Sequence, residues 1–335
     1  LGAPTMKLPF ILAKRFVAGE TFAESAPKIT GLNDAGIAVT LDLLGENVFD
    51  RSVALDTIDD YITLIRQIGE RDLIASISVK LTMMGLDIDT GFCTENLFRL
   101  LEAAREHSMF VRIDMEGSAY TESTLQIFRK AHEEFGPKHV GVVLQAYLHR
   151  TRDDVRDLAA LGADIRLCKG AYKEPARIAL QRMDEIREAY KEYALVLFDA
   201  VAGEAGVAGV AGVSAVADGG VAGVSAVADG GASAGTGGAG DAGRAVAGCP
   251  RIATHDDLLV EWTKDIVMER GFRKDSFEFQ MLYGLRQDTM EQLAADGYQT
   301  RVYVPYGTMW FPYYKRRLTE RKENIFFVLN TLFKK

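Results

Sequence analysis

Cysteine is scarce in this chain, and its scarcity excludes two common frameworks. The 335 residues include three cysteines, Cys93, Cys168 and Cys249, which lie far apart in the sequence. Scattered cysteines argue against a disulfide framework and favour a reducing compartment, so we expect a cytoplasmic protein. The five histidines show no metal-binding spacing either, alone or with the cysteines. We therefore expect no metal.

Long apolar runs and an excess of positive charge are also missing. No segment approaches the roughly 18–20 apolar residues that a membrane-spanning helix needs. The formal net charge of −8 argues against general nucleic-acid binding, because phosphate contacts need a surplus of Lys and Arg. A local cationic cluster could still bind an anionic small molecule, because its positive charge can locally outweigh the negative net charge of the chain.

The sequence does contain a regular alternation of strand-like and helix-like segments. Runs rich in β-branched and aliphatic residues lie at 36–44, 75–82, 109–116, 139–147, 163–172, 251–256, 276–282 and 300–307. Segments with helical spacing lie between them, for example at 57–72, 95–108 and 153–162. Apolar strands separated by helices are typical of a parallel sheet. Eight such units fit a closed barrel, although an open doubly wound sheet has the same repeat.

Polar residues near the strand ends favour the closed barrel. The residues concerned are Asp42, Glu46, Lys80, Asp114, Gln145, Arg166, Lys169, His255, Gln280 and Tyr303. A charge in a buried strand is unfavourable unless it reaches an opening or a partner. In a (β/α)8 barrel these positions converge on one mouth, where active sites are built. We therefore expect one catalytic domain of the TIM-barrel type over residues 1–335.

A low-complexity segment interrupts the alternation between the fifth helix and the sixth strand. Residues 203–248 are nearly all Gly, Ala, Val, Ser and Asp, and "VAGVSAVADGG" occurs twice in tandem, at 210–220 and 221–231. So few large side chains cannot offset the entropy of ordering. We expect a disordered insertion on the face opposite the mouth, with a hairpin or an adhesive surface as alternatives.

The insertion also contains "GTGGAG" at 235–240, which matches a dinucleotide-binding fingerprint. That mechanism requires a strand before the glycines and a helix whose N-terminus holds the pyrophosphate. Glycine-rich chain surrounds the match on both sides, so we discount it.

Charges crowd into the last expected helix, in "YYKRRLTERKEN" at residues 313–324. A solvated face is the simple explanation, because Glu and Arg three or four positions apart stabilise helix surfaces weakly. Arg316 and Arg317, however, present planar donor forks suited to a carboxylate, and Glu320 can hold one guanidinium from within the same helix. With Lys80 adding a point charge, we favour an anion clamp at the barrel mouth.

Eight short motifs together resemble the proline dehydrogenase family, whose members use a flavin to oxidise L-proline to Δ1-pyrroline-5-carboxylate. The motifs are "SVKLT", "RIDMEG", "VLQAY", "RLCKGAY", "ATHDD", "FEFQMLYG", "VYVPYG" and "YYKRRLTER". The resemblance runs from about Ala13 to Lys335 outside the insertion, and Cys168 replaces the aliphatic residue usual in the family. It is nearest to the monofunctional bacterial members, since no second dehydrogenase domain follows.

The resemblance implies a distorted (β/α)8 barrel, with an additional helical segment at the N-terminus, and FAD as the cofactor. It also implies a quinone at the inner face of the cytoplasmic membrane as electron acceptor, and a separate pyrroline-5-carboxylate dehydrogenase as a partner. The sequence shows no clear amphipathic anchor for such a membrane contact.

By the same resemblance, three groups of residues form the site. The catalytic group is Lys80, Asp114, Arg166, Tyr172 and Tyr303. The proline-binding group is Glu46, Lys80, Leu282, Tyr303, Arg316 and Arg317, with an Arg316–Glu46 pair closing a lid. The flavin-binding group is Met115, Gln145, Arg166, Lys169, Gly170, Ala171, Tyr172, Thr254, His255, Gln280 and Glu320. A carboxylate at Asp114, flanked by Lys80 and Arg166, should stay ionised.

Two other functions fit some of these residues. A barrel lyase or aldolase could use Lys80 or Lys169 as a Schiff base, because lysines on barrel strands often serve that way. A barrel scaffold could instead carry an interaction loop at 203–248 and perform no chemistry. A bound flavin would distinguish the dehydrogenase from both.

Overall fold

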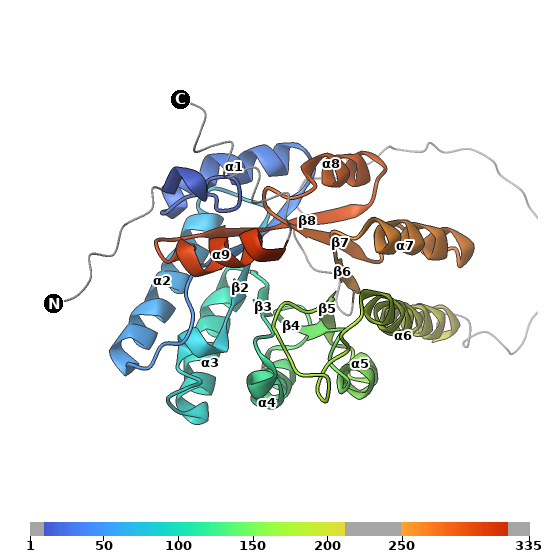
Figure 1. Cartoon of the computed structure of the whole chain (residues 1–335), viewed down its shortest axis with the longest axis horizontal. Coiled ribbons are helices and arrows are strands. Elements are labelled where there is room, and N and C mark those ends of the chain that lie inside the picture. The colour runs from blue at the N-terminus through green and yellow to red at the C-terminus, as the bar shows by residue number, and fades with distance from the viewer. Residues whose placement is uncertain (1–9, 212–248, 321–335) are drawn as a thin grey trace, which may run out of the picture.

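The sheet of this protein closes on itself. The structure is a computed structural model that describes residues 10–211 and 249–320 (Figure 1). Within those ranges eight parallel strands pair in sequence order, and β1 pairs with both β2 and β8. The strands are β1 (Ala38–Leu43), β2 (Ala75–Val79), β3 (Val111–Ile113), β4 (Val140–Gln145), β5 (Asp164–Cys168), β6 (Arg251–Ala253), β7 (Glu278–Leu282) and β8 (Gln299–Tyr306). The expected closed barrel is therefore confirmed, and the open sheet is excluded.

Helices surround the barrel (Figure 1). Those that follow the strands are α2 (Arg51–Gly69), α3 (Thr90–Glu106), α4 (Ser118–Phe135), α5 (Thr151–Ala160), α6 (Met183–Ala211), α7 (Asp257–Glu269), α8 (Gln287–Ala295) and α9 (Trp310–Glu320). Helix α1 (Phe22–Asp34) precedes β1 and is the additional N-terminal helical segment, and short 3-10 turns lie at η1 (Phe10–Leu12) and η2 (Leu81–Met84). Aspartates that precede helices set several starts: Asp50, Asp89 and Asp256 accept hydrogen bonds from first-turn amides of α2, α3 and α7.

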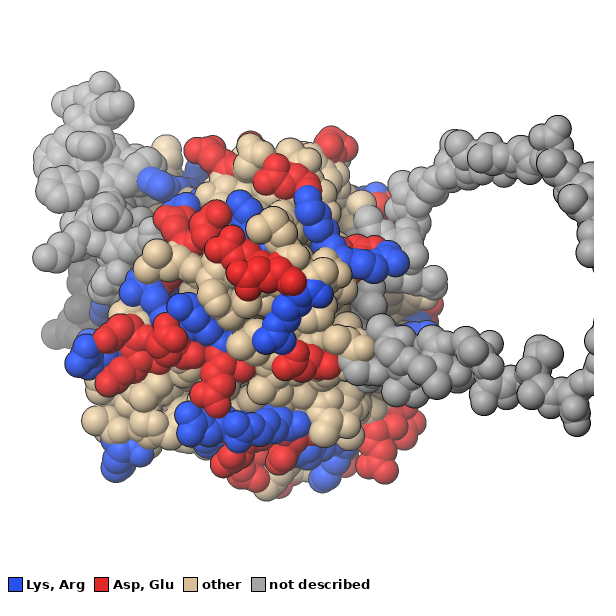
Figure 2. All heavy atoms as spheres, turned by 90° about the vertical axis from the view of Figure 1, so that its right-hand side faces the viewer, with Lys and Arg blue, Asp and Glu red and all other residues tan. Residues whose placement is uncertain are grey.

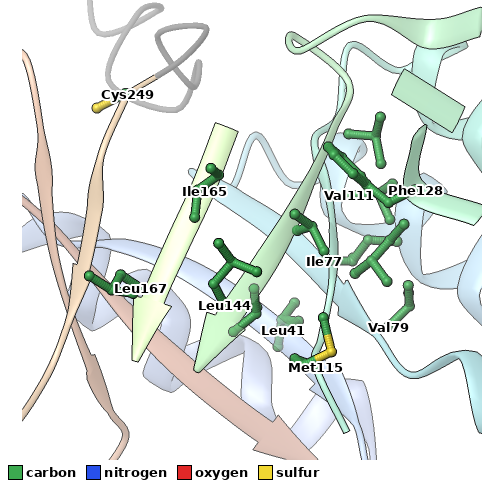
Figure 3. Packing of buried hydrophobic residues seen from close by; sticks show 14 of the residues in the cluster. Leu41, Ile77, Val79, Val111, Met115, Phe128, Leu144, Ile165, Leu167 and Cys249 are labelled. Carbon is green, nitrogen blue, oxygen red and sulfur yellow. The ribbon is translucent and has the colours of Figure 1, made fainter. Parts of the chain in front are cut away.

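The apolar core lies between the strands and the helices. Alternate strand residues such as Ile77, Val79, Val111 and Ile165 are buried there, and Figure 3 shows Phe128 of α4 close to Val111. Burial of such side chains contributes roughly 1.5–3 kcal/mol each. This packing explains why the strand sequences contain so many apolar residues.

The inner faces of the strands are polar, which we did not predict. Buried charged side chains line the interior, and they come from β3, β5, β6, β7 and β8: Arg112, Asp164, Arg251, Glu278 and Arg301. TIM barrels more often fill this space with branched apolar residues. These charges are tolerated because each carboxylate is paired with arginines, for example Arg251 Nη2 with Asp164 Oδ2 at 2.8 Å.

Two sequence expectations need correction. Strands expected at 75–82, 109–116, 163–172 and 251–256 are confined to β2, β3, β5 and β6, so Lys80, Asp114, Lys169 and His255 lie just after their strands. Helix α6 continues through Ala211, so residues 203–211 of the expected disordered insertion are helical. Alanines in "GEAGVAGVA" support that continuation, since Ala has the highest helix propensity. The rest of the insertion, 212–248, and with it the "GTGGAG" match, lies outside the described residues.

The described surface on the α6–α7 side carries interspersed charges of both signs. Figure 2 shows Lys and Arg side chains alternating with Asp and Glu over that face. Among the described helices, none is both long and apolar enough to cross a membrane.

Candidate active site

Side chains from distant strands converge on the carboxylate of Asp114, just after β3. Asp114 Oδ1 accepts hydrogen bonds from Ser78 Oγ at 2.6 Å and from Arg166 Nη1 at 3.0 Å. Asp114 Oδ2 accepts a hydrogen bond of 2.7 Å from Tyr303 Oη, and Lys80 Nζ lies 3.9 Å from the same oxygen. Lys80 and Arg166 thus flank Asp114, and the carboxylate is held from several directions at once.

Lys80 and Tyr303 both have strongly shifted pKa values at this cluster. Lys80 Nζ donates a 2.7 Å hydrogen bond to Asp42, which is also buried. Burial would lower the pKa of Lys80, but Asp42 and Asp114 outweigh it and raise that pKa above its usual value. Burial and then Asp114 raise the pKa of Tyr303 well above its usual value. Lys80 therefore stays cationic and Tyr303 stays a hydrogen-bond donor, and a cationic lysine is a poor Schiff-base nucleophile.

Amide side chains extend the cluster toward β4 and β7. Arg166 Nε donates a 2.6 Å hydrogen bond to Gln280 Oε1. Gln145 Nε2 donates to the carbonyl oxygen of Glu116 at 3.0 Å, and its Oε1 accepts from Ala171 N at 3.3 Å. These bonds hold the loop that follows β5 against the end of β4.

Gly170 in that loop occupies a backbone conformation with φ of 122°, which favours glycine. A Cβ atom at this position would lie 2.2 Å from the ring of Tyr147. Gly170 is therefore needed for the close approach of the loop to Tyr147, whatever else it contacts.

The turn between β6 and α7 is tied to both neighbouring strands. Asp256 accepts hydrogen bonds of 2.9 Å from Lys169 and from Arg187. Thr254 Oγ1 accepts from Asp256 N at 3.1 Å, and His255 Nε2 accepts from Leu282 N at 2.9 Å. The structure thus places Lys169, Thr254 and His255 side by side at the ends of β5 and β6.

Helix α9 meets the loop after β1 through an ion pair between Arg316 and Glu46, the pair that the family resemblance implies. Burial would lower the pKa of Arg316, but Glu46 outweighs it and raises that pKa. Arg317 is 8% exposed, and its guanidinium lies 5.2 Å from the centre of the Tyr313 ring. A buried arginine of this kind is not part of a solvated helix face.

The remaining residues that were predicted for the site lie in different surroundings. Leu282 ends β7 opposite Tyr303 in the strand register, and Tyr172 lies within electrostatic range of Lys80 and Arg316. Met115 belongs to the buried apolar core. The side chain of Glu320 lies outside the described residues.

Sequence reasoning missed several residues of the cluster. Ser78 contacts Asp114, and Asp42 was noted at a strand end without a role in the site. Glu116 is buried and accepts hydrogen bonds from Thr82 N at 3.1 Å and Thr82 Oγ1 at 2.6 Å. Period-two alternation with Lys80 could have revealed Ser78, because residues two apart on a strand share a face.

The donors at this mouth fit a flavin. Arg166 Nη2 donates no hydrogen bond to any group in the described residues, although the rest of its guanidinium is fixed by protein contacts. Gln145, Lys169 and Gln280 add amide and ammonium donors suited to ring carbonyl and phosphate oxygens. In the same described part, no cluster of three or more His, Cys, Asp or Glu could hold a metal ion.

A carboxylate held by several side chains, with an arginine pair, at one mouth of a closed (β/α)8 barrel is the arrangement of a TIM-barrel enzyme active site. The family model described as proline dehydrogenase matches residues 26–191 and 242–330. The chain therefore belongs to the proline dehydrogenase family.

Known relatives match nearly the whole chain. It is 35% identical over 325 residues to proline dehydrogenase 2 of Bacillus subtilis, covering 97% of this chain and 91% of the relative. It is 34% identical over 326 residues to proline dehydrogenase of Deinococcus radiodurans, covering 96% of this chain and 90% of the relative.

A solved structure confirms the fold. Proline utilization A (PutA) from Bdellovibrio bacteriovorus, inactivated by N-propargylglycine, superposes with a TM-score of 0.75 at 21% identity. The match covers 93% of this chain and 33% of that one, so this chain spans about a third of PutA. At this identity the likeness shows the fold alone.

Proposed function

We propose that this protein oxidises L-proline to Δ1-pyrroline-5-carboxylate, with FAD as the hydride acceptor and a quinone as the final electron acceptor. The observation that carries the proposal is the fixing of Asp114 by Ser78, Arg166 and Tyr303 next to the buried Lys80. In a chain of the proline dehydrogenase family, this cluster combines cationic groups that can bind the substrate carboxylate with hydrogen-bond donors suited to a flavin.

The substrate carboxylate would bind the cationic side. Arg316 and Arg317 offer planar forks for a carboxylate, and Lys80 adds a buried positive charge. Glu46 would close over the substrate through its ion pair with Arg316. Leu282 and Tyr303, adjacent across the β7–β8 pair, would form a wall for the apolar ring of proline.

The cofactor would bind the other side. Gln145, Arg166, Lys169, Gly170 and Ala171 would hold the isoalloxazine ring. The remaining predicted contacts are those of Met115, Tyr172, Thr254, His255, Gln280 and Glu320. When bound, FAD supplies the acceptor for the hydride that leaves the ring carbon next to nitrogen. Arg166 would supply a fixed positive charge where negative charge develops on the bound cofactor, and Asp114 would orient both Arg166 and Tyr303 through their hydrogen bonds.

The substrate nitrogen must carry a free lone pair before the hydride leaves, because the product is an imine. Lys80, Arg166, Arg316 and Arg317 disfavour a bound ammonium and would lower the pKa of the substrate amine, whereas the carboxylates paired with them, Asp42, Asp114 and Glu46, oppose part of that shift. We therefore assign the pH dependence expected for flavin reduction to ionisation of the substrate amine, and treat Asp114 as an orienting group.

The product and the electrons need partners. We propose that a separate pyrroline-5-carboxylate dehydrogenase consumes the product, and that the quinone is met at the inner face of the cytoplasmic membrane. The E. coli relative named "Bifunctional protein PutA", which matches at 26% identity over 24% of its length, supports a link to a second activity. We also propose that residues 1–335 form one catalytic domain that carries the low-complexity insertion at 203–248, whose first residues, 203–211, continue helix α6.

An absorption spectrum of the purified protein tests this function directly. We expect flavin bands in the visible range and their bleaching when proline is added without oxygen. Trapping of a substrate adduct by borohydride, in protein without flavin bands, would favour the Schiff-base alternative at Lys80 or Lys169. Protein that neither binds added FAD nor bleaches with proline would overturn the proposal.

A further inference from the structure

Beneath the site, a chain of buried ion pairs runs through the barrel and reaches the site through Gln280. Arg301 Nε lies 2.9 and 3.1 Å from the two carboxylate oxygens of Glu278, and Arg251 Nη1 lies 3.5 Å from Glu278 Oε2. Gln280 Nε2 donates a 2.6 Å hydrogen bond to Glu278 Oε1. Gln280 Oε1 then accepts the 2.6 Å bond from Arg166 Nε.

The direction of these bonds follows from the chemistry of Glu278. Burial would raise the pKa of Glu278, but Arg301 and Arg251 outweigh it and lower that pKa to about 2. An ionised carboxylate only accepts hydrogen bonds, so it must face the NH2 end of the Gln280 amide. The amide oxygen then faces Arg166, whose Nε–H group donates a hydrogen bond to it. Without Glu278, the donor at Arg166 Nε alone would hold the Gln280 amide in this orientation.

Arg166 depends on this orientation. Its Nε is held by Gln280 and its Nη1 by Asp114, so two atoms of one planar group are anchored on opposite sides. A reversed Gln280 amide would set two donors against each other and release the Nε side. The guanidinium could then rotate about the Asp114 contact, and Nη2 would lose its fixed direction.

We infer that Glu278 is a positioning residue for the reaction: by orienting the Gln280 amide it fixes Arg166 at the flavin, although it lies outside the substrate and cofactor contacts. This inference rests on the proposed function. The space around Glu278 supports action by contact, because the interior cavity lined by Arg166, Glu278, Gln280 and Arg301 has a volume of only about 10 Å³. Such a cavity holds at most about one water molecule and no ligand.

The test is the Glu278→Gln variant of the full chain, loaded with FAD. Its amide oxygen is expected to stay with Arg301 and Arg251, so its NH2 group faces Gln280 and reverses that amide. We expect a flavin midpoint potential more negative than in the wild type, an altered visible spectrum, and flavin reduction by proline slowed about 10-fold or more. Spectroelectrochemical titration and anaerobic rapid mixing measure these changes.

The matched control is Asp164→Asn, which removes a comparable buried charge. Asp164 accepts hydrogen bonds from Arg112 and Arg251, and in the described residues it makes none with Gln280. We expect this variant to lose thermal stability as Glu278→Gln does, while its flavin potential and spectrum stay at wild-type values. A second variant, Glu278→Asp, keeps the charge beside the arginines but withdraws it from Gln280, and should shift the potential in the same direction by a smaller amount.

The outcomes separate the two claims. If the wild type binds flavin and bleaches with proline while Glu278→Gln keeps the wild-type potential, the inference alone is wrong. An equal shift in Asp164→Asn would also overturn it, because loss of buried charge would then be the cause. If Glu278→Gln does not fold, a wild-type potential in Glu278→Asp overturns it instead. Failure of the wild type to bleach would overturn the proposed function.

Discussion

The Tyr303 hydroxyl donates a 2.7 Å hydrogen bond to Asp114 although the two residues lie 189 positions apart in the chain. Closure of the barrel makes the contact possible, because the ends of β3 and β8 face the same mouth. Ser78 and Arg166 hold the other carboxylate oxygen, so the Asp114 side chain has little freedom to rotate. This arrangement underlies several of the expectations below.

Changing Tyr303 to Phe should impair proline oxidation without preventing flavin binding. The change leaves a partly buried oxygen of Asp114 without its donor, a loss of about 1–3 kcal/mol, or roughly 5- to 150-fold in the specificity constant. Steady-state kinetics with proline measure it. Tyr190→Phe is the control, because Tyr190 donates a buried 2.9 Å hydrogen bond to the Leu167 carbonyl away from Asp114. Equal losses in both variants would contradict a role specific to the site.

Changing Arg317 to Met should raise the Michaelis constant for proline far more than it lowers flavin content. Loss of a charge-assisted contact with the substrate carboxylate should cost roughly 2–4 kcal/mol, or about 30- to 1000-fold in the specificity constant. Lys315→Met removes the same charge from the exposed side of α9 and should leave the constant nearly unchanged. An unchanged specificity constant in Arg317→Met would return this residue to a purely structural role.

Flavin reduction by proline should rise with pH through a single ionisation, from a pKa below that of free proline. We assign this ionisation to the substrate amine, whose pKa the arginines and Lys80 would lower in excess of the opposing effect of their carboxylate partners. In Asp114→Asn the reaction should slow while the ionisation persists. Rapid mixing from about pH 6 to about pH 10 tests both points. Disappearance of the ionisation in a variant that still binds proline would make Asp114 the general base.

Acid should weaken the fold through Glu278. A folded-state pKa of about 2, below the ordinary value of 4.5, means that this group stabilises the protein above about pH 4.5 and loses that contribution as pH falls toward 2. About 1 kcal/mol should be lost between about pH 6 and about pH 3.5. The gap in unfolding free energy between wild type and Glu278→Gln should narrow by that amount in urea titrations at the two pH values. A gap that is independent of pH would contradict the low pKa.

Removal of residues 212–247, with a short glycine–serine turn in their place, should leave flavin bound and proline oxidation within a few-fold. The segment joins the end of α6 to the start of β6, and in a barrel such junctions lie opposite the active-site mouth. Flavin content and turnover of the shortened protein measure the effect. A folded, soluble variant that no longer binds flavin would place the segment near the site.

Much of the architecture could be predicted from local pattern. The alternation of apolar strands with amphipathic helices determined eight βα units, because strand and helix periods differ and the chain repeats them in order. The polar residues near strand ends also determined that a site would form at one mouth, since Lys80, Asp114, Arg166, Gln280 and Tyr303 recur at corresponding places along the repeat. The length of α6 was harder to predict, because alanine favours helix where glycine opposes it.

Pairing inside the barrel was decided by tertiary structure. The sequence shows charged residues two positions before several site residues: Arg112 before Asp114, Asp164 before Arg166, Glu278 before Gln280 and Arg301 before Tyr303. This alternation could have indicated a polar interior, but not which charge would pair with which. Partners such as Glu278 and Arg301 are selected by the stagger of neighbouring strands once the sheet closes, and closure is a property of the whole sheet. Local pattern therefore determined the elements and the mouth, whereas the contacts that orient Arg166 exist only in the closed barrel.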